Sequence, residues 1–248
     1  MEALVTSRSV VEVSVFDDLE RLSGSAAELF HTLAMTTIAS KGRFVAALSG
    51  GSTPRRLYTL LGSTPYKNII DWRRIHLFWA DERCVPSDHP DSNYRLLRDT
   101  LLIHVPLSEN NIHRVQGEAD PDQAAKYYEQ DIKVFFGTNT IPTFDLMLLG
   151  VGEDGHTASL FPGSPAIHER ERFAVPVYFE KPQLNRVTLT LPIINHAAYV
   201  LFLAAGRAKA SSLHNILNQG NSRKNPAGLV RPENGIVSWF LDREAAGK

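Results

Sequence analysis

Cysteine is almost absent from this sequence, with Cys84 alone among 248 residues. A single cysteine excludes an intrachain disulfide framework and a paired-cysteine metal site. Long apolar runs are missing as well: residues 197–205 form one of the longest, well short of the roughly 20 residues that span a bilayer. No basic segment followed by an apolar core opens the chain, so we expect no secretory signal. The sequence predicts a cytoplasmic protein with no membrane partner.

Charge of one sign is also lacking. Lys and Arg number 26 against 27 Asp and Glu, for a net charge of -1. Without a basic surplus there is no field to attract nucleic acid, so no nucleic-acid partner is expected. Any anionic ligand must instead be held by a few placed cations and backbone amides.

Several catalytic motifs are absent. Neither H-E-x-x-H nor EF-hand spacing occurs, so we expect no metal. The absence of G-x-S-x-G argues against a serine-triad hydrolase. A Walker A loop is missing too, because no glycine-rich segment carries its lysine at the required spacing.

What the sequence does contain is an alternation of strand-like and helix-like segments. Short apolar runs, typical of buried strands in a mostly parallel sheet, occupy 43–48, 75–79, 144–149, 186–191 and 198–204. Helical spacing marks 17–39, a segment from Arg55 to Leu61, and two segments around Tyr94–Leu101 and Ala124–Phe135. Residues 219–235 are loop-like but too short to divide domains. We therefore predict one α/β domain over residues 1–248, with ligands at the carboxyl ends of its strands.

The loop after residue 48 has phosphate-binding chemistry. It reads Ser49-Gly50-Gly51-Ser52-Thr53-Pro54 and leads directly into a predicted helix. Glycines let the backbone approach a ligand, hydroxyls add donors, and a helix N-terminus presents free N–H groups. A tight strand-to-helix turn with no ligand is the alternative reading.

The loop after residue 79 reads Ala80-Asp81-Glu82-Arg83. Three ionisable side chains at the end of an apolar strand need either solvent or partners. Arg83 has the rigid fork that holds an anionic oxygen, and the carboxylates could orient it or accept from hydroxyls. A solvated strand end is the other reading.

The third loop is Gly150-Val151-Gly152-Glu153-Asp154-Gly155-His156. It matches the dinucleotide pattern G-x-G-x-x-G, but Pro162 and Pro165 come too soon for the long helix that should follow. Histidine titrates near neutrality and can accept a proton there. Asp154 could fix its tautomer. The loop therefore predicts a general base at His156, with a structural histidine as the alternative reading.

Two cations complete the candidate set. Arg186 opens a predicted strand, and Lys209 lies at the start of a predicted helix in Gly206-Arg207-Ala208-Lys209-Ala210. A lysine there opposes the helix dipole, which an adjacent bound phosphate would explain; a solvated surface lysine is the alternative.

Together these segments resemble the 6-phosphogluconolactonase family. The matching segments, which span roughly residues 40 to 212, are Ser49–Pro54, Asp81–Arg83, Gly150–Pro162, Arg186–Thr190 with Asn195, and Gly206–Ala210. The resemblance implies a Rossmann-like three-layer sandwich. It also implies hydrolysis of 6-phospho-D-glucono-1,5-lactone to 6-phospho-D-gluconate in the oxidative pentose phosphate pathway, without a cofactor.

The resemblance also suggests roles for individual residues. The catalytic set is His156 as general base with Asp154 and Arg83. The substrate, a small phosphorylated sugar lactone, would be bound by Gly50, Gly51, Ser52, Thr53, Arg55, Asp81, Arg186 and Lys209. Arg186 and Lys209 are implied as charge partners of the phosphate, while Arg83 and Arg55 would hold the sugar or the oxyanion, with their division of labour left open. Either a monomer or a homodimer is expected.

Two other functions are alternatives. Related glucosamine-6-phosphate deaminases carry a glutamate five residues after the histidine, used in ring opening, whereas this chain has Phe161, which cannot shuttle a proton. A non-catalytic sugar-phosphate sensor would need a DNA-binding module, and the sequence shows no basic recognition helix. The lactonase reading is the one we predict.

Overall fold

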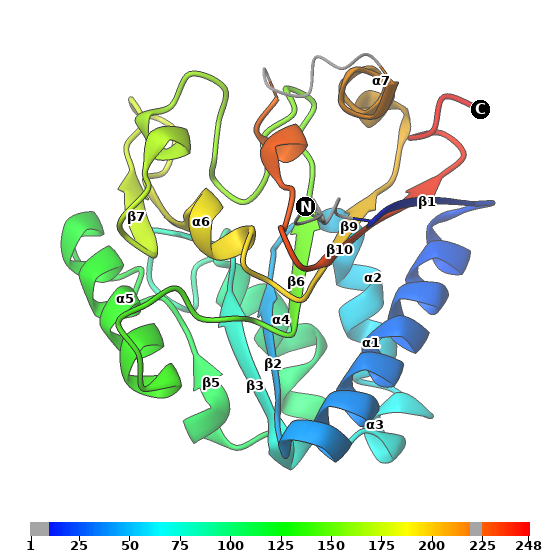
Figure 1. Cartoon of the computed structure of the whole chain (residues 1–248), viewed down its shortest axis with the longest axis horizontal. Coiled ribbons are helices and arrows are strands. Elements are labelled where there is room, and N and C mark those ends of the chain that lie inside the picture. The colour runs from blue at the N-terminus through cyan, green and yellow to red at the C-terminus, as the bar shows by residue number, and fades with distance from the viewer. Residues whose placement is uncertain (1–9, 219–224) are drawn as a thin grey trace, which may run out of the picture.

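The computed structural model describes residues 10–218 and 225–248. Within these residues, seven strands form one sheet in the order β1-β10-β9-β6-β2-β3-β5, and each neighbouring pair runs parallel (Figure 1). The strands are β1 (Val10–Phe16), β2 (Phe44–Leu48), β3 (Ile75–Trp79), β5 (Ile112–His113), β6 (Leu146–Gly150), β9 (Tyr199–Ala204) and β10 (Ile236–Asp242). The prediction of a mostly parallel α/β fold is confirmed.

Four predicted strands form the centre of this sheet. The runs 43–48, 75–79, 144–149 and 198–204 correspond, within two residues, to β2, β3, β6 and β9. Their side chains are almost all buried, which is why the runs are apolar throughout rather than alternating. Strands β1, β5 and β10 were not predicted. β10 follows the expected loop 219–235, of which residues 219–224 lie outside the described residues and Pro226–Leu229 form a 3-10 helix.

A second sheet lies beyond the carboxyl end of β3. It contains β4 (Asp81–Arg83), β8 (Arg186–Leu189) and β7 (Ala174–Val177), paired antiparallel in the order β4-β8-β7. The prediction that 186–191 joins the parallel sheet is wrong, because a short apolar run specifies a strand but not its partner. Ala80 joins the two sheets, since it follows β3 and its carbonyl accepts from the N–H of Leu189 at 2.8 Å.

Helices fill the connections between strands. They are α1 (Leu19–Lys41), α2 (Ser52–Leu61), α3 (Tyr66–Ile69), α4 (Asn93–Thr100), α5 (Pro121–Phe136), α6 (Leu191–Ile194) and α7 (Ala210–Asn218). Helix α1 starts two residues later than predicted because Asp18 caps it, accepting from Arg21 N–H at 2.8 Å. The other three predicted helices correspond to α2, α4 and α5. No helix in residues 10–218 and 225–248 is long and apolar enough to cross a membrane.

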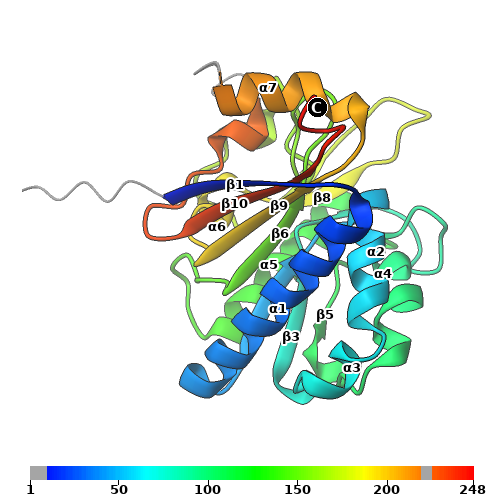
Figure 2. The same ribbon diagram turned by 90° about the vertical axis from the view of Figure 1, so that its right-hand side faces the viewer.

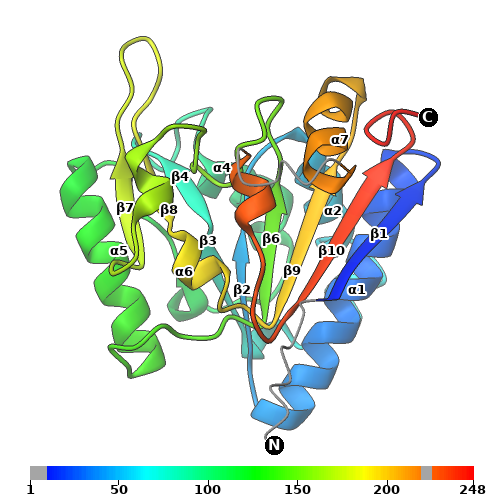
Figure 3. The same cartoon turned by 45° about the horizontal axis from the view of Figure 1, so that its top comes forward.

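The two faces of the parallel sheet are covered by different helices. Figure 2 shows α1, α2 and α4 together on one side of it, whereas α6 lies on the other side in Figure 3. Side-chain alternation explains the division. Phe44 of β2 packs edge-on against Phe30 of α1, with ring centroids 5.3 Å apart. Phe78 of β3 points to the opposite face and meets Phe135 of α5 at 5.2 Å.

The parallel arrangement brings several loops to one edge. Strands β2, β3, β6 and β9 all end there, so the segments that follow them converge above the sheet (Figure 3). This edge is where ligands bind in open α/β sheets.

Candidate active site

A cavity of about 170 Å³ lies at the carboxyl ends of these strands. Nine predicted site residues line it: Gly50, Gly51, Ser52, Thr53, Asp81, Arg83, His156, Arg186 and Lys209. The remaining lining residues are Ser49, Pro54, Asn93, Gly150, Val151, Gly152, Ala158 and Leu203. The structure thus gathers side chains from both halves of the chain into one space.

The glycine loop turns the chain from β2 into α2. Gly51 has a φ of 107°, a conformation that residues with side chains rarely adopt. A Cβ on Gly50 would lie 1.7 Å from Oδ1 of Asn93, so this approach requires glycine. Among the described residues, no side chain caps α2 and no acidic residue lies in its first turn. Its N–H groups are therefore available to an anion in the cavity.

The loop after β6 is a compact turn. Gly152 N–H donates to the carbonyl of His156 at 2.8 Å, and Gly155 N–H donates to that of Gly152 at 3.0 Å. Gly155 has a positive φ of 81°, and a Cβ on Gly152 would lie 2.0 Å from Nδ1 of His156. The glycines of the G-x-G-x-x-G pattern thus allow the turn that places His156. The next α-helix in the chain is α6, which begins at Leu191, so no long helix follows the loop, as predicted.

His156 is hydrogen-bonded to Asp154. Asp154 Oδ1 lies 2.5 Å from Nδ1 of the His156 ring and also accepts from the backbone N–H of His156 at 3.1 Å. Burial raises the pKa of Asp154, but these hydrogen bonds outweigh it and leave the pKa below its usual range. A carboxylate only accepts hydrogen bonds, so Nδ1 carries the ring proton and Nε2 keeps its lone pair.

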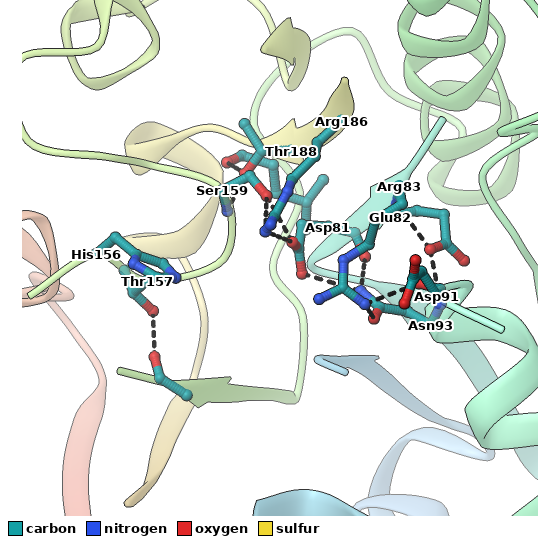
Figure 4. Close-up of polar contacts among 12 residues, drawn as sticks. Asp81, Glu82, Arg83, Asp91, Asn93, His156, Thr157, Ser159, Arg186 and Thr188 are labelled. Carbon is teal, nitrogen blue, oxygen red and sulfur yellow. Dashed lines mark hydrogen bonds and ion pairs between the residues drawn. The ribbon is translucent and has the colours of Figure 1, made fainter. Parts of the chain in front are cut away.

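Arg83 is held by Asn93 and the backbone near it. Its Nη1 donates to Oδ1 of Asn93 at 2.6 Å and to the carbonyl of Asp91 at 2.9 Å (Figure 4). Asn93 is 2% exposed, and its Nδ2 donates to the carbonyl of Asp81 at 2.8 Å. The buried Asn93 amide therefore fixes the Arg83 guanidinium next to Asp81, the first residue of β4.

Glu82 does not line the cavity but anchors α4. Its carboxylate accepts from the backbone N–H groups of Asn93 and Tyr94, each at 2.7 Å. Burial raises the pKa of Glu82, and these two bonds, with a third from Arg83 N–H, oppose the rise. The middle residue of the Asp81–Arg83 motif is thus structural.

Arg186 reaches the cavity from β8. Its Nη1 lies 3.4 Å from Oγ of Ser159 and 3.9 Å from Oδ2 of Asp81. Ser159 Oγ in turn donates to Asp81 Oδ2 at 2.6 Å, and Figure 4 shows Asp81 between the two arginine side chains. Burial lowers the pKa of Arg186, Asp81 opposes this, and the nearby Arg83 adds to it; the guanidinium stays charged at neutral pH.

Lys209 and Arg55 have different surroundings. Lys209 lies in a 3-10 turn, Arg207–Lys209, just before α7, and its Nζ donates to the carbonyl of Val151 at 2.6 Å. Arg55 is exposed on α2 and lies outside the set of described residues that line the cavity. Within the described residues, no group of three or more His, Cys, Asp or Glu side chains could hold a metal ion.

Two residues of the site network were not predicted from the sequence. Asn93 follows Ser92, which caps α4, since its Oγ accepts from Arg95 N–H at 3.1 Å. Ser159 belongs to the Gly150–Pro162 motif, and its backbone N–H donates to Thr188 Oγ1 at 3.1 Å. Asn93 is 12 residues from Asp81, and Ser159 is 78. The available signal for Ser159 was its place in that motif.

Comparison with known proteins gives consistent matches. The family model described as glucosamine-6-phosphate isomerases/6-phosphogluconolactonase matches residues 17–239. The chain is 40% identical to the 6-phosphogluconolactonase of Rattus norvegicus, covering 94% of this chain and 92% of the rat protein. It is 42% identical to that of Synechocystis sp., covering 84% and 85%. The structure of 6-phosphogluconolactonase from Trypanosoma cruzi superimposes with a TM-score of 0.86 at 31% identity and covers 98% of both chains. This chain belongs to the glucosamine-6-phosphate isomerase/6-phosphogluconolactonase family.

Proposed function

We propose that this chain hydrolyses 6-phospho-D-glucono-1,5-lactone to 6-phospho-D-gluconate, in the oxidative pentose phosphate pathway, with His156 as the general base. The chain is an enzyme of the 6-phosphogluconolactonase type, a hydrolase of a sugar-phosphate lactone. The observation that carries the role of His156 is its ring in the cavity wall, bonded to Asp154 at 2.5 Å. Arg83, Arg186 and Lys209 bring positive charge to the same cavity.

Lactone hydrolysis needs a base and then an acid at one position. Nε2 of His156 would take a proton from water as the water oxygen bonds to the lactone carbonyl carbon. The carbonyl oxygen becomes an oxyanion, which a nearby guanidinium stabilises. When the intermediate collapses, the bond from this carbon to the ring oxygen breaks. The ring oxygen then takes the proton from His156, and the product carboxylic acid ionises in water.

Asp154 supports both steps. Its bond to Nδ1 keeps the tautomer in which Nε2 is the base, and its charge stabilises the imidazolium that forms after proton transfer. The lowered pKa of Asp154 keeps it ionised at neutral pH. We therefore assign Asp154 a supporting catalytic role.

The cations divide between the phosphate and the reacting carbonyl. We place the phosphate at the Gly50–Thr53 loop, where α2 presents uncapped N–H groups, with Lys209 and Arg186 as charge partners. Asn93 fixes the Arg83 guanidinium at 2.6 Å, so we assign the oxyanion to Arg83. Arg55 is exposed outside the cavity, and we give it no role in the reaction. Asp81 orients Arg186 and can accept from a sugar hydroxyl.

The test is the rate of His156→Ala on freshly prepared 6-phosphogluconolactone, corrected for spontaneous hydrolysis. Loss of a general base should lower kcat at least about 10²-fold. His168→Ala, which removes an exposed histidine, is the matched control and should keep the wild-type rate. Near-normal turnover by His156→Ala would remove the assignment. Ammonia release from glucosamine 6-phosphate would instead indicate deaminase chemistry.

A further inference from the structure

The Phe161 ring contacts two functional side chains of the candidate site. Its centroid lies 4.3 Å from that of the His156 ring, with 30° between the planes. Cζ of Arg186 lies 5.4 Å from the same centroid. Phe161 is outside the set of described residues that line the main cavity, and it borders an adjoining cavity of about 270 Å³ that shares Arg83 and Arg186. Phe161 therefore contacts the side chains of His156 and Arg186 rather than the main cavity itself.

The tilted ring contact with Phe161 restrains the His156 ring, whose side chain is hydrogen-bonded to Asp154 through Nδ1. The terminal torsion of a histidine side chain is soft, so the bond from Nδ1 to Asp154 fixes a point but not the plane of the ring. Backbone at Gly152 bounds the ring as well, since a Cβ there would lie 2.2 Å from Cε1 of His156. Phe161 supplies a flat surface against which the plane is set. The direction of the Nε2 lone pair depends on that plane.

The same surface is electrostatically suited to a cation. An aromatic face carries negative charge and attracts guanidinium and imidazolium groups. Arg186 lies over the Phe161 ring, and its Cζ also lies 5.6 Å from the centroid of Phe179. Phe179 in turn packs edge-on against Phe161, with centroids 5.1 Å apart and planes at 87°. Phe179 thus contacts both Phe161 and Arg186, whereas the ring contact with His156 is made by Phe161.

We propose that Phe161 is a positioning residue that sets the plane of the His156 ring and stabilises its imidazolium form during lactone hydrolysis. The proposal rests on the proposed function of His156 as general base. It assigns a positive role to the position at which the related deaminases carry a glutamate. A cation on an aromatic face gains a factor of roughly 2 to 30 in equilibrium terms, which sets the scale of the expected effect.

The test compares Phe161→Leu with Phe179→Leu. Both variants remove an aromatic ring from Arg186 and leave an apolar side chain, but only Phe161→Leu removes the ring in tilted contact with His156. We expect Phe161→Leu to lower kcat about tenfold with less than about a twofold change in KM. Without the aromatic face the imidazolium is less favourable, so the acid limb of the pH–rate profile should move to lower pH. Phe179→Leu should leave the acid limb in place.

A second readout does not depend on activity. The His156 ring proton signals, assigned by their loss in His156→Ala, should move in Phe161→Leu because the aromatic ring current is gone, and should stay close to wild type in Phe179→Leu. Phe161→Tyr, which restores the ring, should recover kcat to within about threefold of wild type. If Phe161→Leu proves unstable by thermal melting, Phe161→Met takes its place.

The outcomes separate this proposal from the proposed function. If Phe161→Leu matches Phe179→Leu in kcat and in the acid limb, Phe161 is packing only and the proposal is overturned. If the His156 ring signals also stay unchanged in Phe161→Leu, the ring contact between Phe161 and His156 is refuted. If instead His156→Ala retains the wild-type rate, the proposed role of His156 as general base is overturned, whatever the NMR signals show.

Discussion

Lys209 brings its ammonium group to the cavity with one donor already used. Nζ donates to the carbonyl of Val151 at 2.6 Å, and an ammonium has three N–H donors. The contact aims the side chain and leaves two donors for a phosphate. Since an ammonium is a point charge, its contribution should depend on the charge of the ligand.

Lys209→Ala should therefore raise KM for 6-phosphogluconolactone about 10- to 100-fold, the range of one lost charged hydrogen bond. The KM for unphosphorylated gluconolactone should change less than about twofold. Arg207→Ala, an exposed cation in the same turn, is the control for a general loss of positive charge. Equal effects of Lys209→Ala on both lactones would remove Lys209 from the phosphate site.

Turns whose geometry depends on the local chain could be predicted from the sequence, and contacts made across the fold could not. The glycines around His156 and the glycine loop sit in short turns, so their pattern indicates the chemistry. Asn93 joins Arg83 to Asp81 through contacts made only when α4 packs against β4. No local pattern distinguishes such an asparagine from a surface one. Arg55 follows Pro54 in a turn that the sequence does indicate, yet its side chain is exposed outside the cavity. The position of a residue in a motif does not fix the direction of its side chain.

At the level of elements, burial explains most of what the sequence could predict, although β10 was missed while most of its side chains are buried. The central strands β2, β3, β6 and β9 are apolar runs without an alternative reading. Edge strand β1 exposes Val11 and Val13 by 54% and 49%, and β5 has only two residues, so neither carries a buried-strand signal. Strand β8 was recognised as a strand but assigned to the wrong sheet, because Val187 and Leu189 are fully buried there too. Sheet membership is a long-range property that a four-residue run does not encode.

The contact between β3, β5 and α5 contains a partly buried chain of titratable groups. Nδ1 of His76 lies 3.4 Å from Nε2 of His113, and Nδ1 of His113 lies 3.0 Å from Oδ2 of Asp131. Burial lowers the pKa of His76 to about 4, with His113 and Arg43 adding to the effect. Between pH 6.5 and that value, the unfolded chain binds a proton at His76 that the folded chain does not. Stability should therefore fall as the pH drops through this window.

His76→Phe should reduce that loss while keeping the ring contact with Phe135, whose centroid lies 4.6 Å from that of His76. The full pKa shift of His76 would correspond to a loss of about 3 kcal/mol in the free energy of unfolding. Because the His76 side chain is only half-buried, solvent screening reduces this effect, and we expect a loss of about 1 kcal/mol. Urea unfolding at pH 7 and pH 4.5 measures the difference, with His104→Gln at an exposed site as control. An unchanged pH dependence in His76→Phe would contradict the prediction.

At the scale of the whole molecule, the two sheets are joined by backbone contacts and by a helix that packs against both. Strand β3 passes into β4 through Ala80, and Leu189 N–H bonds back to its carbonyl at 2.8 Å. Helix α5 contacts both sheets: Tyr128 Oη bonds to the backbone of Trp79 at 2.7 Å, and the same helix packs against β7. We therefore propose that the described residues form one folding unit, as expected for the single predicted domain.

One folding unit predicts one unfolding transition, and the tryptophans can test it from opposite parts of the sheet. Trp72 and Trp79 lie at β3, whereas Trp239 of β10 stacks on Phe202 with centroids 3.8 Å apart. In Trp239→Phe the fluorescence reports on β3, and in the double variant Trp72→Phe with Trp79→Phe it reports on β10. Within each variant the fluorescence midpoint in urea should coincide with the midpoint from far-ultraviolet circular dichroism. A fluorescence transition that departs from the circular dichroism transition in either variant would show that β3 and β10 unfold separately. The cavity between these strands would then lie at a boundary between two folding units rather than within one.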